Sequence, residues 1–285
     1  MSTATHTSHR RLWAACLLLG ALGASAAQAE TTFERIKSTG TIRIGYANEA
    51  PFAFTDTSGK VTGESPEIAT QIFKQMGIAK VEPVLTEWGA LIPGLRAGRF
   101  DVIAAGMYIT PPRCKQVIFT DPHYQIPDTL LVQKGNPKNL HSYADIAKDP
   151  STRLAVMAGT VELGYARKSG VKDEQIVQVP DTTAQLQAVR ASRADASVGT
   201  ALTMKGLATK GGDGVELVTD FKDDPAHTGY GALAFRPEDK DLRDAVNQQL
   251  KGWLGGEEHL KTVQPFGFDR SNLTDKSAEA LCAQP

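Results

Sequence analysis

One arginine of this chain, Arg113, stands where a side chain could recognise a carboxylate. It follows the loop 107–112, which itself follows the apolar run 101–106, a pattern typical of a buried strand. A guanidinium presents a planar fork of donors that matches the two oxygens of a carboxylate, and the Thr110 hydroxyl and loop amides could complete the shell. An arginine at the start of a surface helix is equally common, so these residues alone leave both interpretations open.

The composition is that of an ordinary soluble protein, with 285 residues, 41% hydrophobic, 22% charged and a net charge of −1. A charge so close to zero gives no electrostatic case for binding nucleic acid or an anionic membrane surface. His123 and His141 show none of the spacings of metal ligands, so no metal or other cofactor is predicted. Binding of a small neutral or zwitterionic molecule is compatible with this composition.

Residues 1–29 have the pattern of a signal peptide. Arg10 and Arg11 precede the apolar run 12–24, and the small residues at 27 and 29 predict cleavage before Glu30. The apolar run is shorter than the ~20 residues that a membrane-spanning helix needs. The mature protein is therefore expected to be exported from the cytoplasm.

Once this segment is removed, Cys114 and Cys282 remain, in an oxidising compartment where disulfides persist. A disulfide between them would tie the end of the chain to the segment that carries Arg113. A buried thiol at 114 and a loose tail at 282 is an equally good interpretation, because disulfide geometry is not encoded in spacing alone.

Strands and helices alternate along the first half of the chain. The patterns predict strands at 41–46, 81–85 and 101–106, and helices at 32–38, 64–76 and 90–97. Alternation at this spacing favours an α/β fold whose sheet is rich in parallel strands.

A second series of the same kind follows. Its expected strands are 154–157, 175–179 and 194–198, and its expected helices begin at 161 and 182. Two extended apolar runs, 129–134 and 229–235, are interpreted as crossings between two lobes. The predicted organisation is a first lobe of residues 30–133 and 231–270, a second lobe of residues 134–230, and a polar C-terminal tail, 271–285.

Two α/β lobes joined by two strands imply a cleft that can close by hinge bending. Sheets of this kind bind ligands at the loops that follow the carboxyl ends of their strands. The predicted site is therefore made of the loops 48–54, 86–88, 107–113, 159–160 and 199–200.

Several motifs carry a resemblance to a known family. They are Ala50-Pro51-Phe52, Gly98-Arg99-Phe100-Asp101, the run from Gly106 to Arg113, and Phe119-Thr120-Asp121-Pro122. With them the chain resembles the polar amino acid family of solute-binding proteins of ABC importers over residues 30–268. The resemblance implies a two-lobed, type II periplasmic-binding-protein-like α/β fold and a monomer that is not an enzyme. It also implies delivery of a small molecule to permease subunits with a cytoplasmic ATPase, and a salt bridge from Arg113 to the ligand carboxylate.

Two positions depart from the family members that bind α-amino acids. Those members usually hold the α-ammonium with an aspartate where this chain has Thr200, and a desolvated ammonium without that partner would lose about 2 to 5 kcal/mol. They usually have a small hydroxyl residue where this chain has Tyr108. Phe52, Trp88 and Tyr108 thus stand on three of the site loops, and aromatic faces attract diffuse cations by about 0.5 to 2 kcal/mol each.

A carboxylate clamp, an aromatic box and the acceptor Glu49 together describe a ligand with a carboxylate and a delocalised cation. Ectoine and hydroxyectoine, which are cyclic amidinium carboxylates, fit this description, and the chain resembles the family members that bind them. The predicted ligand-binding residues are Glu49, Phe52, Trp88, Tyr108, Thr110, Arg113, Thr160 and Thr200. The alternative is that the aromatic residues belong to the core and Glu49 faces solvent.

Two rival functions stay open. A polar or cationic amino acid is the first alternative ligand. The second alternative is an exported lyase on the same fold, similar to cyclohexadienyl dehydratase, for which Glu49 would be the obvious acid although Trp88 and Tyr108 crowd it.

Overall fold

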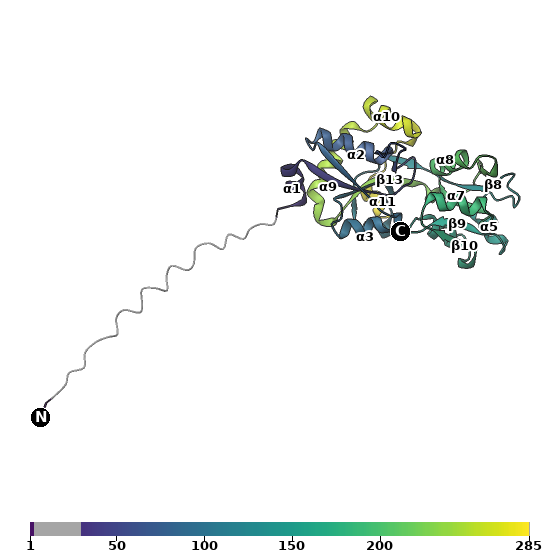
Figure 1. Ribbon diagram of the computed structural model, residues 1–285, viewed down its shortest axis with the longest axis horizontal. Coiled ribbons are helices and arrows are strands. Elements are labelled where there is room, and N and C mark those ends of the chain that lie inside the picture. The colour runs from purple at the N-terminus through teal and green to yellow at the C-terminus, as the bar shows by residue number, and fades with distance from the viewer. Residues whose placement is uncertain (3–29, 285) are drawn as a thin grey trace. The chain divides into compact units, whose positions relative to one another are not determined.

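The computed structural model describes residues 1–2 and 30–284 (Figure 1). Nearly all of the predicted signal peptide, and with it the apolar run 12–24, therefore lies outside the described residues. Within the described part, no helix combines the length and the apolar character that crossing a membrane requires.

The first sheet forms around one completely buried strand, β5. Its strands are β4 (Lys80–Leu85), β1 (Thr41–Tyr46), β5 (Val102–Tyr108), β13 (Gly229–Phe235), β6 (Ile118–Phe119) and β7 (Tyr124–Ile126). β1 lies parallel to both β4 and β5, whereas β13 runs antiparallel to β5, β6 and β7. The expected parallel strands are thus present, and an antiparallel strand extends the sheet. A separate hairpin pairs β2 (Phe54–Thr55) with β3 (Val61–Thr62).

Side chains of β5 alternate between two hydrophobic clusters, because successive residues of a strand point to opposite faces. Val102 and Ala104 pack with the buried sides of α2 and α9, and Ile103 and Ala105 pack with α3. The helices of this lobe are α1 (Thr32–Thr39), α2 (Glu64–Gln75), α3 (Leu91–Arg96), α4 (Pro111–Cys114), α9 (Lys240–Trp253), α10 (Glu257–Val263) and α11 (Ala278–Cys282). Both faces of the sheet are therefore covered, as the apolar sequence of β5 requires.

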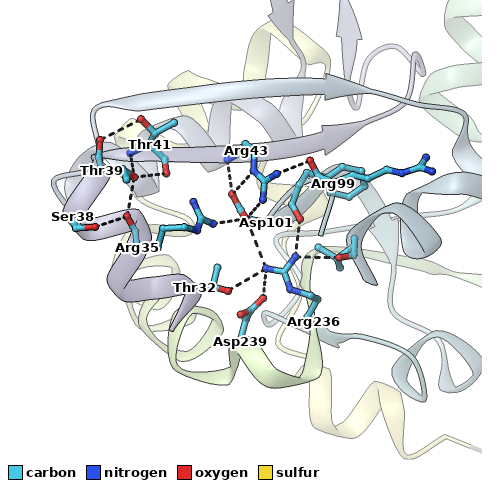
Figure 2. A network of polar contacts seen from close by, with 12 residues as sticks. Thr32, Arg35, Ser38, Thr39, Thr41, Arg43, Arg99, Asp101, Arg236 and Asp239 are labelled. Atoms are coloured by element: carbon cyan, nitrogen blue, oxygen red, sulfur yellow. Dashed lines mark hydrogen bonds and ion pairs between the residues drawn. The ribbon is translucent and has the colours of Figure 1, made fainter. Parts of the chain in front are cut away.

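A buried carboxylate, Asp101, fixes the beginning of β5 (Figure 2). Its Oδ1 accepts hydrogen bonds from Arg35 at 2.6 Å and from Arg43 at 2.8 Å. Arg236, at the end of β13, forms an ion pair with Asp239 at 2.6 Å and donates to backbone carbonyls of the segment that leads into β5. Burial raises the pKa of Asp101, but the hydrogen bonds and charges of the arginines outweigh it and lower this pKa below the ordinary value.

The second sheet repeats the mixed arrangement. Its strands, in spatial order, are β10 (Ile176–Val179), β9 (Leu154–Met157), β11 (Ala196–Thr200), β8 (Asp128–Gln133) and β12 (Val215–Leu217). Figure 1 shows α5, α7 and α8 gathered around these strands. The helices of this lobe are α5 (Tyr143–Lys148), α6 (Glu162–Lys168), α7 (Thr182–Arg190) and α8 (Ala201–Gly211). The predicted α/β fold with two sheets is confirmed.

The crossing between the sheets differs from the prediction. The run 129–134 was expected to end the first lobe, yet β8 pairs with β11 and β12 and so belongs to the second sheet. Its apolar side chains are buried inside that sheet. The chain therefore changes sheets at Pro127, between β7 and β8, and returns between β12 and β13.

The C-terminal tail packs on the first lobe. Cys114 and Cys282 form a disulfide across 168 residues of sequence, which decides between the two interpretations that the sequence left open. Leu281 is completely buried beside it, and the polar segment 271–285 thus ends in an anchored helix, α11.

Candidate ligand-binding site

A pocket with an empty volume of about 300 Å³ lies where loops of the two lobes meet. All five predicted site loops approach it, because the carboxyl ends of β1, β4, β5, β9 and β11 point toward it. The pocket is lined by Glu49, Phe52, Trp88, Ala105, Gly106, Tyr108, Arg113, Tyr124, Thr160, Val161, Glu162 and Thr200. Seven of the eight predicted residues are in this set.

Arg113 belongs to α4, the single helical turn after β5, and its side chain is 8% exposed. Its Nη1 donates to the carbonyl of Tyr108 at 3.0 Å and its Nη2 to the carbonyl of Gly159, on the second lobe, at 3.3 Å. Its guanidinium carbon lies 5.8 Å from the centre of the Trp88 ring. Within the described chain it pairs with no carboxylate, and burial lowers its pKa. The pocket thus contains a desolvated cation whose hydrogen-bond partners are all neutral, and the charge of Glu162 offsets only part of the effect of burial on its pKa.

The aromatic side chains belong to the core and to the pocket wall at once. Phe52 and Tyr108 are nearly inaccessible to solvent and are part of the first-lobe core, yet both line the pocket. Tyr124, which the sequence analysis did not select, packs between them, with ring centres 5.2 Å from Phe52 and 6.4 Å from Tyr108. Its hydroxyl donates to the carbonyl of Gly106 at 2.6 Å. Core membership and pocket lining are therefore compatible interpretations here.

Glu49 is buried, and its side chain forms a hydrogen bond with the second lobe. Its Oε1 accepts a hydrogen bond of 3.0 Å from the hydroxyl of Thr203, in the first turn of α8. Burial, followed by the charge of Glu162, raises the pKa of Glu49 to about 7. Thr200 caps the same helix, because its hydroxyl accepts from the backbone N–H of Thr203 at 3.3 Å.

Glu162 is the main pocket residue that sequence reasoning missed. It is the first residue of α6, it is 5% exposed, and its Oε2 has no hydrogen-bond partner within the described chain. Burial raises its pKa. An acid in the first turn of a helix is usually explained by the helix dipole, but this one follows β9 by a few residues, at the edge where ligands bind. Its position shortly after a predicted strand was the sequence signal that could have identified Glu162 as a pocket residue.

A third carboxylate, Asp128, lies behind the wall. It is buried, its Oδ2 has no hydrogen-bond partner in residues 30–284, and its Oδ1 is 3.5 Å from the Tyr108 hydroxyl. Burial raises its pKa well above the ordinary value. Three acids thus lie around the guanidinium of Arg113, and burial favours the protonated form of each, so a cationic ligand would find carboxyl groups able to ionise when it binds.

The prediction for Thr110 is the one that the pocket does not support. Thr110 is absent from the lining, and its carbonyl instead accepts the N–H groups of Arg113 and Cys114 at 3.0 and 2.9 Å. It precedes α4 in extended conformation, so its backbone supports the turn. Thr160 does line the pocket, with its hydroxyl bonded to the carbonyl of Met157 at 3.0 Å.

Comparison with known proteins agrees with this architecture. Residues 42–257 match the family of bacterial extracellular solute-binding proteins, family 3. A "Probable amino-acid ABC transporter periplasmic-binding protein" of Sinorhizobium fredii is 37% identical over 262 residues, which are 88% of this chain and 86% of that protein.

Two solved structures are similar over most of the chain. The crystal structure of EhuB in complex with hydroxyectoine has 35% identity and a TM-score of 0.84, with 90% of this chain and 99% of that one covered. The crystal structure of AncCDT-1, an ancestral amino acid-binding protein and a precursor of cyclohexadienyl dehydratase, has 31% identity and a TM-score of 0.73, with 83% and 99% covered.

These similarities confirm the predicted two-lobed periplasmic-binding-protein fold. The family and the relatives named above are solute-binding proteins and not enzymes, and this applies to AncCDT-1 as well. The two mixed sheets, the pocket between their loops and the match over residues 42–257 lead to one conclusion: the chain belongs to family 3 of the bacterial extracellular solute-binding proteins, and serves an ABC transporter.

Proposed function

We propose that this protein binds ectoine or hydroxyectoine in the pocket and delivers it from the periplasm to an ABC importer. The observation that carries the proposal is Arg113, a buried guanidinium that forms no ion pair with a carboxylate of the described chain, in a pocket that also holds aromatic faces and Glu49. A ligand carboxylate would supply the missing countercharge in the bidentate geometry that a guanidinium favours.

The other end of the pocket suits a flat, delocalised cation. The amidinium ring of ectoine would lie against Trp88, Phe52 and Tyr108, and its N–H groups would donate to Glu49. The similarity to EhuB, whose crystal structure contains hydroxyectoine, supports the same assignment.

A polar or cationic amino acid is the second candidate, and Glu162 is the observation that favours it. The absence of an aspartate at Thr200 argued against a ligand with an α-ammonium, but Glu162 brings an acid with an unbonded oxygen to the same lobe. The relative from Sinorhizobium fredii is named as an amino-acid binder. Arg113 suits the carboxylate of either ligand, so the choice of ectoine over an amino acid depends on the aromatic walls and not on the lack of a second acid.

Closure of the lobes is the proposed mechanism of delivery. A ligand that bonds to Arg113 on the first lobe and to Thr160 and Thr200 on the second would favour the closed arrangement by its differential affinity. Direct contacts such as that between Glu49 and Thr203 already join the two walls. The permease would then recognise the closed protein.

Isothermal titration calorimetry tests the proposal on protein purified from the periplasm, with the mature N-terminus read by mass spectrometry. We expect processing before Glu30 and binding of ectoine or hydroxyectoine at least tenfold tighter than of arginine, lysine, glutamine or proline. Tighter binding of one of the amino acids would favour the second candidate. The absence of heat with every compound at millimolar concentration would reject both candidates.

A further inference from the structure

The last residues of the chain touch the segments that position Arg113 and the hinge. We call residues 270–282 the C-terminal strap. Asn272 donates to the carbonyl of Gln125 at 3.1 Å, and the Gln125 side chain donates back to the carbonyl of Leu273 at 3.1 Å. Further along, the N–H of Ala278 donates to Asp121 at 2.9 Å. The strap is thus bonded at two points, Asp121 and Gln125, to the segment that leads from β6 into β7.

The strap ends on the turn that carries Arg113. The disulfide joins Cys282 of α11 to Cys114 of α4, which is the residue next to Arg113. α4 has four residues, and helices this short are not stable without external contacts. Leu281, 1% exposed, inserts beside the disulfide into the core cluster that also contains Val117. A covalent bond and an apolar anchor therefore hold this turn from one side.

The same strap touches the crossing between the lobes. Gln125 is the middle residue of β7, and the chain changes sheets at Pro127, directly after this strand. The strap is therefore bonded both to the hinge strand and to the turn that carries Arg113. A change in the strap would reach both the carboxylate site and the hinge.

We infer that the C-terminal strap is a positioning element, which links the turn of Arg113 to the hinge strand β7 through the Cys114–Cys282 disulfide and thereby raises affinity for the ligand carboxylate. The part that concerns affinity rests on the proposed function. The part that concerns the position of α4 and β7 does not.

Hydrogen exchange measured by mass spectrometry tests the mechanical part without any ligand. The variant is the double substitution Cys114→Ser with Cys282→Ser. The control is Ile146→Ala, which removes a completely buried side chain from the core of the second lobe. The two proteins are compared at temperatures equally far below their midpoints of unfolding, because both substitutions lower stability.

We expect exchange of residues 111–117 and 124–126 to accelerate at least tenfold in the cysteine variant and to stay unchanged in the control. Equal exchange of these segments in both proteins would overturn the inference. In addition, Leu281→Ala keeps the disulfide and should accelerate the same segments by a smaller factor.

Calorimetry with the tightest ligand of the panel tests the affinity part. We expect the dissociation constant to rise at least fivefold in the cysteine variant, while Ile146→Ala leaves it within twofold of the unmodified protein. An unchanged constant in the cysteine variant would overturn this part. If no compound binds the unmodified protein, the proposed function fails, and the exchange experiment still decides whether the strap positions α4.

Discussion

The two ends of β5 hold buried charges in opposite conditions. At its beginning, Asp101 is completely buried but meets Arg35 and Arg43, which together lower its pKa. At its far end, Arg113 donates hydrogen bonds only to backbone carbonyls, while Glu49 and Glu162 are buried with raised pKa values. One strand therefore connects a satisfied ionic network with an unsatisfied one.

The difference separates a structural role from a binding role. A buried ion whose partners are all supplied by the chain contributes to the folded state, and removing one partner leaves the others uncompensated. A buried ion whose partner is missing lowers the stability of the folded protein. That stability is recovered when a ligand brings the opposite charge. The following predictions test this contrast from the largest effect to the smallest.

Asp101→Ala should give the largest loss of stability. The substitution leaves Arg43, Arg35 and Arg236 without the carboxylate that they surround, so we expect the free energy of unfolding to fall by about 3 to 5 kcal/mol. Urea denaturation measures it. Glu82→Ala, which removes an exposed ion pair with Lys80, is the control and should change stability by less than about 1 kcal/mol. Similar losses in both variants would refute the structural role of Asp101.

Arg113→Ala should reduce affinity for the ligand and not the stability of the protein, the reverse of the effect expected for Asp101→Ala. We expect affinity for the ligand to fall by about 2 to 5 kcal/mol, because the ligand carboxylate would be left buried without its partner. Stability of the empty protein should stay the same or increase, since a desolvated cation is removed. Arg113→Lys keeps the charge but not the planar fork and should recover only part of the affinity. A loss of affinity below about tenfold, or 1.4 kcal/mol, would contradict the carboxylate clamp.

Most of the strands, helices and loops that position these two groups of charges were predictable from the sequence. The predicted strand 41–46 coincides with β1, and the predicted helix 64–76 differs from α2 by one residue, because both segments have clear periodicity and clear turn signals at their ends. The five site loops followed from a general rule about the carboxyl ends of strands. Local patterns and topology thus sufficed wherever the information was contained in neighbouring residues.

Contacts between distant segments were not predictable in the same way. The run 129–134 is apolar in either role, and only its pairing with β11 and β12 shows that it belongs to the second sheet. The partner of Cys114 lies 168 residues away. Glu162 has the position of a dipole-stabilising acid, and its burial beside the pocket is a property of the folded chain that local sequence does not encode.

Glu49→Gln tests the unsatisfied end through pH. Because the pKa of Glu49 is raised from 4.5 to about 7, the folded protein binds a proton more tightly than the unfolded chain, so stability falls as pH rises through this window. The whole shift corresponds to about 3 kcal/mol. We therefore expect the glutamine variant to be more stable than the unmodified protein at pH 8, by about 2 to 3 kcal/mol, and no more stable at pH 4. Urea denaturation at the two pH values measures the difference in free energy of unfolding between the two proteins. If this difference were the same at pH 4 and pH 8, titration of Glu49 would not contribute to the pH dependence of stability.

Glu162→Gln should have the smallest effect and discriminates between the two ligand classes. Its unbonded oxygen is the group in the second lobe best placed to receive a compact ammonium, whereas a flat amidinium can be stabilised by Glu49 and the aromatic faces. We expect the substitution to weaken binding of an α-amino acid about tenfold, or 1.4 kcal/mol, and binding of ectoine by less than threefold. Calorimetry on one protein preparation with both ligands gives the ratio of the two losses in affinity.

Glu258→Gln, in the exposed first turn of α10, is the matched control and should change neither dissociation constant. If ectoine lost as much affinity as the amino acid, Glu162 would be part of the ectoine site. The charge at this end of β5 would then be shared by two acids, and the ligand cation would lie between the lobes and not on the aromatic wall.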